Sequence, residues 1–388
     1  MSNAKKTIPQ LSTLPEKCCG CSACYAVCPA NAITMREDEE GFLYPFVDSG
    51  KCLGCNKCIS ICAFKKKPVP NETIISVYAV KHTSTTVRMN SRSGGIFTAL
   101  SDEILKRNGV IYGCIMKDQY TAEHIRAESP DDRDKMRGSK YIQSNMEGCF
   151  QQVKKDLLTG REVLFSGTSC QADGLRSYLG KEYDNLICLD IICHAVPSRK
   201  VWESFVRNQE KKHGECTDID FRNKKDFGWA DHIETLSFDK KGKKKYVDTE
   251  IFKNMFYGDY ISRPSCYECP YKSIYHPGDI TIGDYWGIEK AAPGFDDGKG
   301  VSLVIINTEK GRQMFNAVKD SCEYTETKIE DSMQAPLSRP IGKPENRNEF
   351  WTDYKKYDFS RIIKKYGTKN RKQIIKYYLR RLKRITKK

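Results

Sequence analysis

The sequence predicts a small α+β module at the amino terminus, followed by a larger α/β domain with parallel βαβ units and a β-rich carboxyl-terminal part. Three observations lead to this fold class. Cysteines repeat at a fixed spacing between residues 18 and 62, apolar strands alternate with helical patterns between residues 74 and 206, and strand-like patterns dominate residues 216–260. Short strands that alternate with helices are typical of parallel sheets. Because the chain has 388 residues, it exceeds one comfortable hydrophobic core and should divide into domains.

Two copies of one cysteine spacing lie in the amino-terminal module. Each has the form Cys-x-x-Cys-x-x-Cys-x-x-x-Cys. This is the bacterial ferredoxin spacing, in which each run supplies three thiolates to one 4Fe-4S cluster and its fourth to the other. We therefore expect an α+β ferredoxin-like domain with two clusters over residues 1–72. One cluster would be held by Cys18, Cys21, Cys24 and Cys62, and the other by Cys52, Cys55, Cys58 and Cys28.

Zinc sites or a disulfide framework are the alternative interpretation of these cysteines. A zinc site needs four ligands and leaves the repeated spacing unexplained, so the cluster interpretation is preferred. Two short strands are expected between the runs, at residues 32–36 and 41–44, on either side of an acidic turn. Cys19 lies outside the spacing and is interpreted as a bystander, and Ala63 stands where a proline is common. A basic, proline-broken stretch at residues 65–71 would be the linker to the next domain.

Residues 73–155 open the larger domain. Strands are expected at residues 74–80 and 110–116. Helices are expected after the glycine pair at positions 94 and 95 and between residues 146 and 160, because apolar residues recur there at helical spacing. These apolar residues are Ile96, Leu100, Ile104 and Leu105 in the first helix and Met146, Phe150, Val153 and Leu157 in the second.

Residues 156–340 carry the clearest α/β pattern. A buried strand at residues 163–165 is followed by a loop, a helix and a second strand at residues 186–192. Strand–helix–strand with short loops predicts a parallel βαβ unit, so both strand-exit loops should lie at the carboxyl edge of one sheet. One exit loop carries Cys170 and the other carries Cys193.

Four cysteines outside the amino-terminal runs could form a third site, namely Cys170, Cys193, Cys266 and Cys269. The last two form a Cys-x-x-Cys pair that ends at Pro270. Four converging thiolates suit a third iron–sulfur cluster or a zinc ion, whereas the alternative is two buried cysteines beside a redox or zinc pair. Spacing alone leaves these alternatives open. Cysteines without such partners are interpreted as small core residues, namely Cys114, Cys149, Cys188, Cys216 and Cys322.

Two polar segments of the larger domain could bind a ligand. Residues 91–95 read Ser-Arg-Ser-Gly-Gly before a helix, and both the helix amino terminus and Arg92 could bind phosphate. Residues 138–144 hold a cation, an aromatic ring and an amide, which suit a flavin ring. A tight turn and a solvated loop are the alternatives, and the residues alone favour these plainer interpretations.

The basic composition is concentrated at the carboxyl terminus. Residues 361–388 contain thirteen of the 65 lysines and arginines and no acidic residue, so the rest of the chain has a net charge near +2 against +15 for the whole. This distribution argues against specific nucleic-acid binding. The predicted tail, residues 341–388, has an apolar helical face and could lie on an anionic membrane surface or bind an acidic protein. The apolar face consists of Ile374, Ile375, Tyr378, Leu382 and Ile385.

A cytoplasmic location is expected. Residues 1–10 are polar and lack the apolar core of a secretion signal, and no stretch reaches the roughly 18 apolar residues that span a bilayer. Iron–sulfur assembly favours a reducing compartment. The tail could bring the protein to the inner face of the membrane.

Several motifs of the larger domain occur in a characteristic order. They follow a ferredoxin-like segment and read SRSGGIFTAL, GSKYIQS, GTSCQ, ICHAVPS, DFRNKKDFGW, RPSCYECP and DITIGDYWG. This arrangement, over about residues 15–310, resembles the coenzyme F-420 hydrogenase/dehydrogenase beta-subunit family. That family contains deazaflavin-oxidising subunits of methanogens, reductases of plants and cyanobacteria that act on chlorophyll intermediates, and many bacterial proteins. The resemblance does not fix the substrate.

The resemblance implies FAD and a further 4Fe-4S cluster in the larger domain. The cluster ligands would be Cys170, Cys193, Cys266 and Cys269. The flavin contacts would be Arg92, Ser93, Gly94, Gly95, Thr98, Gly138, Ser139, Lys140, Tyr141, Gln143, Gly167, Thr168 and Gln171. His194 and Lys140 are candidate catalytic residues by position. Ser169 and Ala195 depart from the usual family residues, proline and glycine, and could alter the pocket above the flavin.

Together these features predict an iron–sulfur flavoprotein oxidoreductase. Residues 73–155 would form the FAD-binding part of the larger domain and residues 156–340 the part with the third cluster. An external ferredoxin would load the clusters, the clusters would reduce FAD, and FAD would reduce a small organic molecule. Two alternatives are oxidation of a reduced deazaflavin with electron export through the clusters, and a pure electron-transfer subunit of a larger complex without a substrate pocket.

Overall fold

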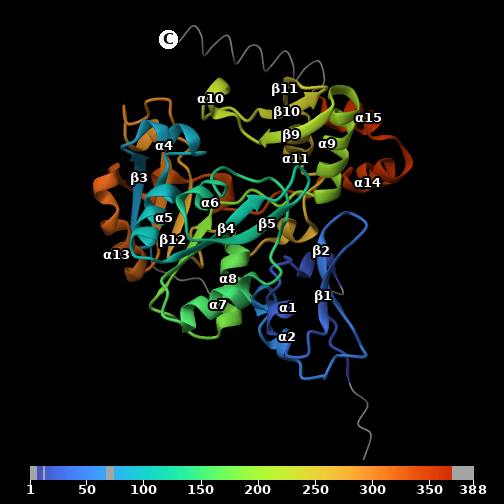
Figure 1. The fold of residues 1–388 in the computed structure, drawn as a ribbon, viewed down its shortest axis with the longest axis horizontal. Coiled ribbons are helices and arrows are strands. Elements are labelled where there is room, and N and C mark those ends of the chain that lie inside the picture. The colour runs from blue at the N-terminus through green and yellow to red at the C-terminus, as the bar shows by residue number, and fades with distance from the viewer. Residues whose placement is uncertain (1–6, 12–13, 67–73, 369–388) are drawn as a thin grey trace, which may run out of the picture.

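The larger domain is built on a mixed sheet (Figure 1). The computed structural model describes residues 7–11, 14–66 and 74–368. Within these residues nine strands form the sheet, in the order β14-β3-β13-β12-β8-β7-β4-β5-β6. The strands are β3 (Ser76–His82), β4 (Val110–Met116), β5 (Ala122–Ala127), β6 (Ser144–Asn145), β7 (Val163–Thr168), β8 (Leu186–Ile191), β12 (Ile280–Asp284), β13 (Ser302–Ile306) and β14 (Cys322–Thr327).

The middle of this sheet is parallel. β7 pairs with β8 from Val163↔Leu186 to Thr168↔Ile191, and β4–β7 and β8–β12 are also parallel pairs. β13, β3 and β14 extend one edge through antiparallel pairs, and β4–β5 is antiparallel as well. The predicted βαβ unit is confirmed, because helix α8 (Ser169–Leu179) joins β7 to β8. The sheet as a whole is mixed.

Helices cover both faces of the sheet. In β7, Leu164 lies in a hydrophobic cluster with helix α5 (Ile96–Lys106) and helix α13 (Glu309–Ala317). Its neighbour Phe165 lies in a second cluster with α8 and with helix α7 (Cys149–Leu158). Successive side chains of a strand point to opposite faces, so the two clusters lie on opposite sides of the sheet. This double covering explains why β7 and β8 read as continuous apolar runs.

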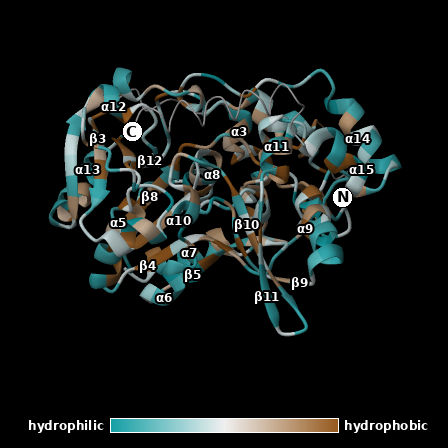
Figure 2. Cartoon of the chain, turned by 90° about the horizontal axis from the view of Figure 1, so that it is seen from above, coloured by the Kyte–Doolittle hydropathy of each residue, from teal (hydrophilic) through white to brown (hydrophobic). Residues whose placement is uncertain are grey.

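A three-stranded antiparallel sheet forms the β-rich part predicted for residues 216–260. Its strands, in the order β11-β10-β9, are β9 (Glu215–Asp220), β10 (Glu234–Lys240) and β11 (Lys243–Thr249). The sheet packs with helix α9 (Arg199–His213) and helix α11 (Ile251–Tyr257) around the fully buried Trp202 and Phe252. The turn between β10 and β11 projects from the body and is hydrophilic (Figure 2).

The first part of the segment predicted to be a basic amphipathic tail, residues 341–388, is folded against the body of the protein. Helix α14 (Arg347–Lys356) and helix α15 (Phe359–Ile362) lie beside α9, and Phe350 and Trp351 join the hydrophobic cluster around Trp202. The structured chain therefore continues well beyond residue 341. The apolar face predicted beyond residue 369 lies outside the described residues. In the part that the structure describes, no helix combines the length and the apolar character needed to cross a membrane.

The amino-terminal module is an antiparallel hairpin with short helices. β1 (Ile33–Glu37) pairs with β2 (Leu43–Val47), close to the two strands predicted there. Helices α1 (Ala23–Val27) and α2 (Lys57–Ser60) each contain the third cysteine of a run, and α3 (Ala63–Lys66) follows. The expected linker falls largely on residues 67–73, outside the described residues.

This module packs closely against the larger domain. Ala23 joins the hydrophobic cluster of α7 and α8. Gly174 in α8 approaches the first cysteine run so closely that a Cβ atom there would lie 2.8 Å from Cys21 Sγ. In the hairpin turn, Glu40 forms a bidentate ion pair with Arg347 of α14. The first cysteine run is therefore held against α8.

Candidate functional site

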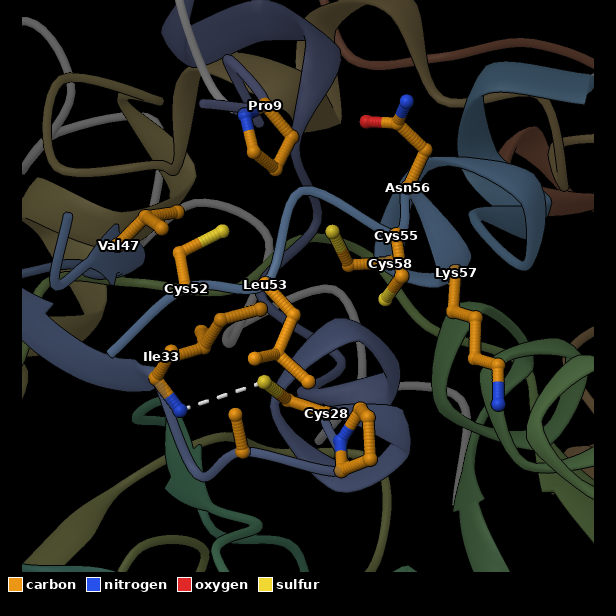
Figure 3. Close-up of a pocket in the computed structure, with 13 residues that line it drawn as sticks. Pro9, Cys28, Ile33, Val47, Cys52, Leu53, Cys55, Asn56, Lys57 and Cys58 are labelled. Atoms are coloured by element: carbon orange, nitrogen blue, oxygen red, sulfur yellow. Dashed lines mark hydrogen bonds between the residues drawn. The ribbon is translucent and has the colours of Figure 1, made fainter. Parts of the chain in front are cut away.

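One pocket of the amino-terminal module is lined by cysteines from both runs (Figure 3). They are Cys28, Cys52, Cys55 and Cys58. Two backbone N–H groups donate to its sulfurs, Ala32 to Cys28 at 3.3 Å and Gly54 to Cys52 at 3.4 Å. The pocket gathers the four cysteines that the spacing predicts for one 4Fe-4S cluster.

The neighbouring pocket is lined by the other predicted ligand set. This set is Cys18, Cys21, Cys24 and Cys62. Cys58 lines both pockets, so the two adjoin. The grouping is that of the crossed ferredoxin pattern, in which the last cysteine of each run faces the other cluster. Ligation itself stays a prediction.

The two cysteine runs bend in the same way. Gly20 and Gly54 have φ angles of 73° and 69°, and Ser22 and Asn56 have φ angles of 67° and 57°. Each pair occupies equivalent positions, two and four residues after the first cysteine of its run. Left-handed backbone is freely available to glycine and costs other residues conformational energy. These paired bends turn successive sulfurs toward one pocket, which gives the repeated spacing a structural reason.

The third set of cysteines converges at the carboxyl edge of the large sheet. Cys170 and Cys193 follow β7 and β8, and Cys266 and Cys269 lie in and just after the turn η2 (Pro264–Glu268). This turn packs on the β8 exit loop, since Arg263 N donates to Val196 O at 2.9 Å. The turn therefore folds over the sheet edge, as a shared site for the four sulfurs requires.

Burial and mutual proximity change the pKa values of these four thiols. Burial raises the pKa of Cys193, Cys266 and Cys269, in the last case to about 12, and the nearby Cys170 raises each pKa further. Four thiolates so close together would repel one another unless a metal group shared their charge. Among the described residues, no three His, Cys, Asp or Glu side chains are arranged as a site for a single metal ion.

Cys19, which the sequence suggests is a bystander, lies near thiols of two cysteine sets. It acts on the pKa of Cys21, in the first run, and on that of Cys170, in the third set. Its presence lowers the pKa of Cys170 to about 7 and also lowers the pKa of Cys21. Cys19 therefore lies between two cysteine sets that are about 150 residues apart in the chain.

The segment at residues 91–95 is held by the protein around it. A Cβ atom at Gly94 would lie 2.1 Å from Val80 O, so close packing against β3 requires glycine here. Ser93 Oγ donates to Val301 O at 2.6 Å, and the ammonium of Lys224 donates to Ser93 O at 2.8 Å. These contacts fix the loop without a ligand.

Two arginines beside this loop share one carboxylate. Arg222 donates to Asp284 Oδ2 at 2.8 Å, and Arg92 Nε lies 3.9 Å from the same oxygen. Burial, followed by the Arg222 charge, lowers the pKa of Arg92 to about 10. Among the described residues, Nε and one terminal nitrogen of Arg92, and Nε of Arg222, have no hydrogen-bond partner. Because unpaired buried N–H groups are costly, this cluster has the chemistry of a site for an anionic group.

An aromatic group adjoins the arginine pair. Tyr141 and His194 both pack on Phe256, with ring centroids 5.4 and 5.0 Å from it. The hydroxyl of Tyr141 accepts a hydrogen bond from Arg222 at 3.3 Å. Tyr257, which is 49% exposed, lies 5.1 Å from the His194 ring. The structure thus brings the predicted residues Arg92, Tyr141 and His194 to one region at the carboxyl edge of the sheet.

Lys140, a predicted catalytic residue, is turned into its own loop. Its ammonium donates to the carbonyl of Lys135 at 2.9 Å and to that of Arg137 at 2.7 Å. Burial lowers its pKa to about 8. The neighbouring Gly138 has φ of 77°, is exposed and has open space where a Cβ atom would lie, and Ser139 is half-buried. The Lys140 side chain closes this loop.

Other predicted flavin contacts have partners within the protein. Gln143 Oε1 accepts from Leu43 N at 2.9 Å, in the amino-terminal module. Gln171 caps α8, because its Oε1 accepts from Thr168 N at 2.9 Å. Thr98 Oγ1 accepts from Arg137 at 3.1 Å. Gly95 begins α5 with φ of 95°, and Gly167 packs against the Gln171 side chain. Gln143 therefore binds the two domains together.

Known families match both parts of the chain. Residues 17–66 match the 4Fe-4S dicluster domain, and residues 160–332 match the family described as the carboxyl terminus of the coenzyme F420 hydrogenase/dehydrogenase beta subunit. The chain is thus similar to this beta-subunit family over residues 160–332, a little under half of its length. It is accordingly an iron–sulfur electron-transfer oxidoreductase related to those beta subunits.

One solved structure and the curated proteins complete the comparison. A chain of the xenon-derivatised F420-reducing NiFe hydrogenase complex from Methanosarcina barkeri aligns with a TM-score of 0.46 and 19% sequence identity. The alignment covers 68% of this chain and 84% of that chain. No curated protein matches the sequence.

Sequence reasoning missed several residues of this beta-subunit relative. Arg222 and Lys224 lie in the motif at residues 220–229, which marks the family without suggesting a role for its side chains. Arg263 precedes the Cys-x-x-Cys pair and is buried against the first cysteine run. The charged residues of the motif were the available signal. Their partners are distant in sequence, so the pattern alone does not reveal them.

Proposed function

We propose that this protein passes electrons from an external ferredoxin through three 4Fe-4S clusters to FAD and thereby reduces a small organic substrate. Cys28, Cys52, Cys55 and Cys58 would hold one cluster, Cys18, Cys21, Cys24 and Cys62 the second, and Cys170, Cys193, Cys266 and Cys269 the third. Bound clusters carry single electrons, and bound FAD combines them for two-electron reduction of an organic molecule.

The continuity of the three cysteine sets carries this proposal. Cys58 lines both pockets of the amino-terminal module. The first cysteine run packs on α8, the helix that contains Cys170, and Cys19 lies near both Cys21 and Cys170. A chain of adjoining thiol sites is what stepwise electron transfer needs, and a structural zinc site would not require it.

The residues of the larger domain fit an anionic, aromatic cofactor. The unpaired N–H groups of Arg92 and Arg222 suit a pyrophosphate, which Arg binds in bidentate fashion. Tyr141 and Tyr257 offer aromatic surface for a ring system. His194 Nε2 lies 3.1 Å from Asp259 Oδ1, so exchange of a proton with a substrate would take place at Nδ1.

An electron donor would dock where the first pocket reaches the surface. Cys55 is exposed, and the adjacent Leu53 is 64% exposed. Phe46, on the neighbouring strand β2, is 46% exposed. A small apolar surface next to a cluster is suited to a transient protein partner.

Anaerobic reconstitution followed by flavin reduction tests the proposal. The loaded protein should contain about twelve irons and one FAD, and reduced ferredoxin should reduce the flavin. If reduced deazaflavin reduces the flavin and reduced ferredoxin does not, electrons flow in the opposite direction. A protein that takes up zinc in place of iron, or no FAD, would contradict the proposal.

A further inference from the structure

Arg263 is a buried cation at the junction of the cysteine sets. Its side chain is 1% exposed and reaches the amino-terminal module from the segment before η2. Arg263 Nε donates to Cys18 O at 2.9 Å, and one terminal nitrogen lies 3.8 Å from Cys18 Sγ and 3.1 Å from Leu43 O. The other terminal nitrogen donates to Gln143 Oε1 at 3.1 Å. Four acceptors therefore fix the guanidinium beside the first cysteine of the first run.

Sulfur, not carboxylate, is the counter-charge for this arginine. Among the described residues, no carboxylate oxygen comes within 4 Å of Arg263. The guanidinium lies 4.2 Å from the ring centroid of Tyr44, and its charge acts on Cys18, Cys19 and Cys266. A buried cation with this environment is best neutralised by a negatively charged cluster.

The internal repeat of the module isolates the effect of Arg263. Backbone N–H groups point at the first cysteine of each run, from Gly20 to Cys18 and from Gly54 to Cys52. These matched hydrogen bonds would contribute similarly to the reduction potentials of both clusters. Exposed lysines line both pockets, with Lys57 at one and Lys17 and Lys65 at the other. Water and salt screen exposed charges, so three electrostatic differences between the two pockets remain: the buried cation Arg263, the carboxylate of Asp173 near Cys21, and the deeper burial of the first run. Arg263 is the only buried cation among these three.

We propose that Arg263 raises the reduction potential of the cluster held by Cys18, Cys21, Cys24 and Cys62 and leaves that of the cluster held by Cys28, Cys52, Cys55 and Cys58 unchanged. The inference rests on the proposed function for its ligand sets. A thiolate-bound cluster is negatively charged and gains further negative charge on reduction, so a fixed nearby cation stabilises the reduced form. An N–H donor to sulfur acts in the same sense.

The position of Arg263 would influence the direction in which electrons move between the two clusters. The site without the arginine contains the exposed Cys55, where a donor can approach. The site with the arginine packs on α8, the helix that contains Cys170, since a Cβ atom at Gly174 would lie 2.8 Å from Cys21 Sγ. Arg263 would thereby favour the movement of electrons from the exposed site to the site beside the third cysteine set. Arg263 is therefore a positioning residue that orders the relay.

Gln143 offers a way to cancel the charge without removing the arginine. Its Oε1 accepts from both Arg263 and Leu43 N, and its side chain is 5% exposed. Gln143→Glu keeps the size and both acceptor contacts while placing a carboxylate against the guanidinium. Arg263→Lys keeps the charge and loses most of the hydrogen bonds. Arg36→Met, at an exposed arginine on β1, is the matched control.

The experiment is a redox titration of the iron-loaded protein followed by electron paramagnetic resonance. Gln143→Glu and Arg263→Met should move one of the two amino-terminal cluster signals to more negative potential and leave the other in place. Arg263→Lys should move that signal less, and Arg36→Met should move neither. Cys24→Ser identifies the signal of the inner cluster, because it alters a ligand of that site alone.

Equal shifts of both signals, or no shift in iron-replete Gln143→Glu, would overturn the inference. If Arg263→Met fails to fold, Gln143→Glu and Arg263→Lys decide it. Absence of two four-iron signals in the unaltered protein would instead reject the proposed function.

Discussion

Replacing Gly174 with alanine should weaken the seating of the first cysteine run on α8. Alanine ordinarily stabilises a helix interior by about 1 kcal/mol relative to glycine. Here the added Cβ atom would lie 2.8 Å from Cys21 Sγ and 2.9 Å from Cys21 Cβ. Ordinary contacts begin near 3.4 Å, so Cys21 or the helix must move by about 0.6 Å. Because such overpacking costs about 1–3 kcal/mol, we expect a net loss of up to about 2 kcal/mol.

The assay is anaerobic chemical unfolding of the iron-loaded protein together with its iron content. Gly174→Ala should lower the unfolding midpoint and reduce the occupancy of the cluster next to Cys21. Lys155→Ala, at an exposed position of α7, is the control for a helix substitution that does not touch Cys21. It should change the unfolding midpoint and the iron content little. If Gly174→Ala raises the free energy of unfolding by the full propensity gain and keeps its iron, the close packing of α8 on Cys21 is refuted.

Three further predictions follow from contacts at the same site and from the carboxyl-terminal segment. Cys19→Ala should keep the iron content but slow electron transfer from the amino-terminal clusters to the flavin, as measured by stopped-flow absorbance. An unchanged rate would show that Cys19 has no part in electron transfer. Burial, followed by the Arg92 charge, lowers the pKa of Lys224 to about 7. The unfolded chain therefore binds more protons between about pH 7 and 10, so the free energy of unfolding should rise with pH in that window, and less steeply in Lys224→Gln; parallel pH profiles would contradict this. Truncation after residue 368, which spares the buried Tyr366, should reduce sedimentation with anionic liposomes; equal binding by the full chain would exclude the membrane role of the tail.

The cysteine spacing predicts more of this molecule than any other feature. Ligand sets that cross between two runs follow from a local repeat, and the left-handed bends at Gly20 and Gly54 make that repeat geometrically effective. The βαβ unit is equally readable, since β7 and β8 are buried on both faces and keep continuous apolar runs. Both signals depend on residues that are close in sequence.

Contacts between segments that are distant in the chain could not be predicted from the sequence. The family resemblance assigns Gln143 to a flavin contact, and the sequence gives no sign that its amide also binds Leu43 and Arg263 from two other parts of the chain. The proximity of Cys19 to Cys170 leaves no periodic pattern in the sequence. The charge of the carboxyl-terminal segment suggests an amphipathic tail and does not reveal that Phe350 and Trp351 pack its first part into a core. In each of these cases the contacts of the residue depend on tertiary packing, which the spacing of residues in the sequence does not encode.

The most direct test of the three-cluster relay is replacement of Cys266 and Cys269 together with serine, with iron content and ferredoxin-driven flavin reduction measured on the same anaerobic sample. We expect a loss of about four irons, intact signals from the two amino-terminal clusters, and severely slowed reduction of any FAD that stays bound. Full iron content together with full flavin reduction by ferredoxin would contradict the relay, and the Cys-x-x-Cys pair would then be structural or the site of another metal.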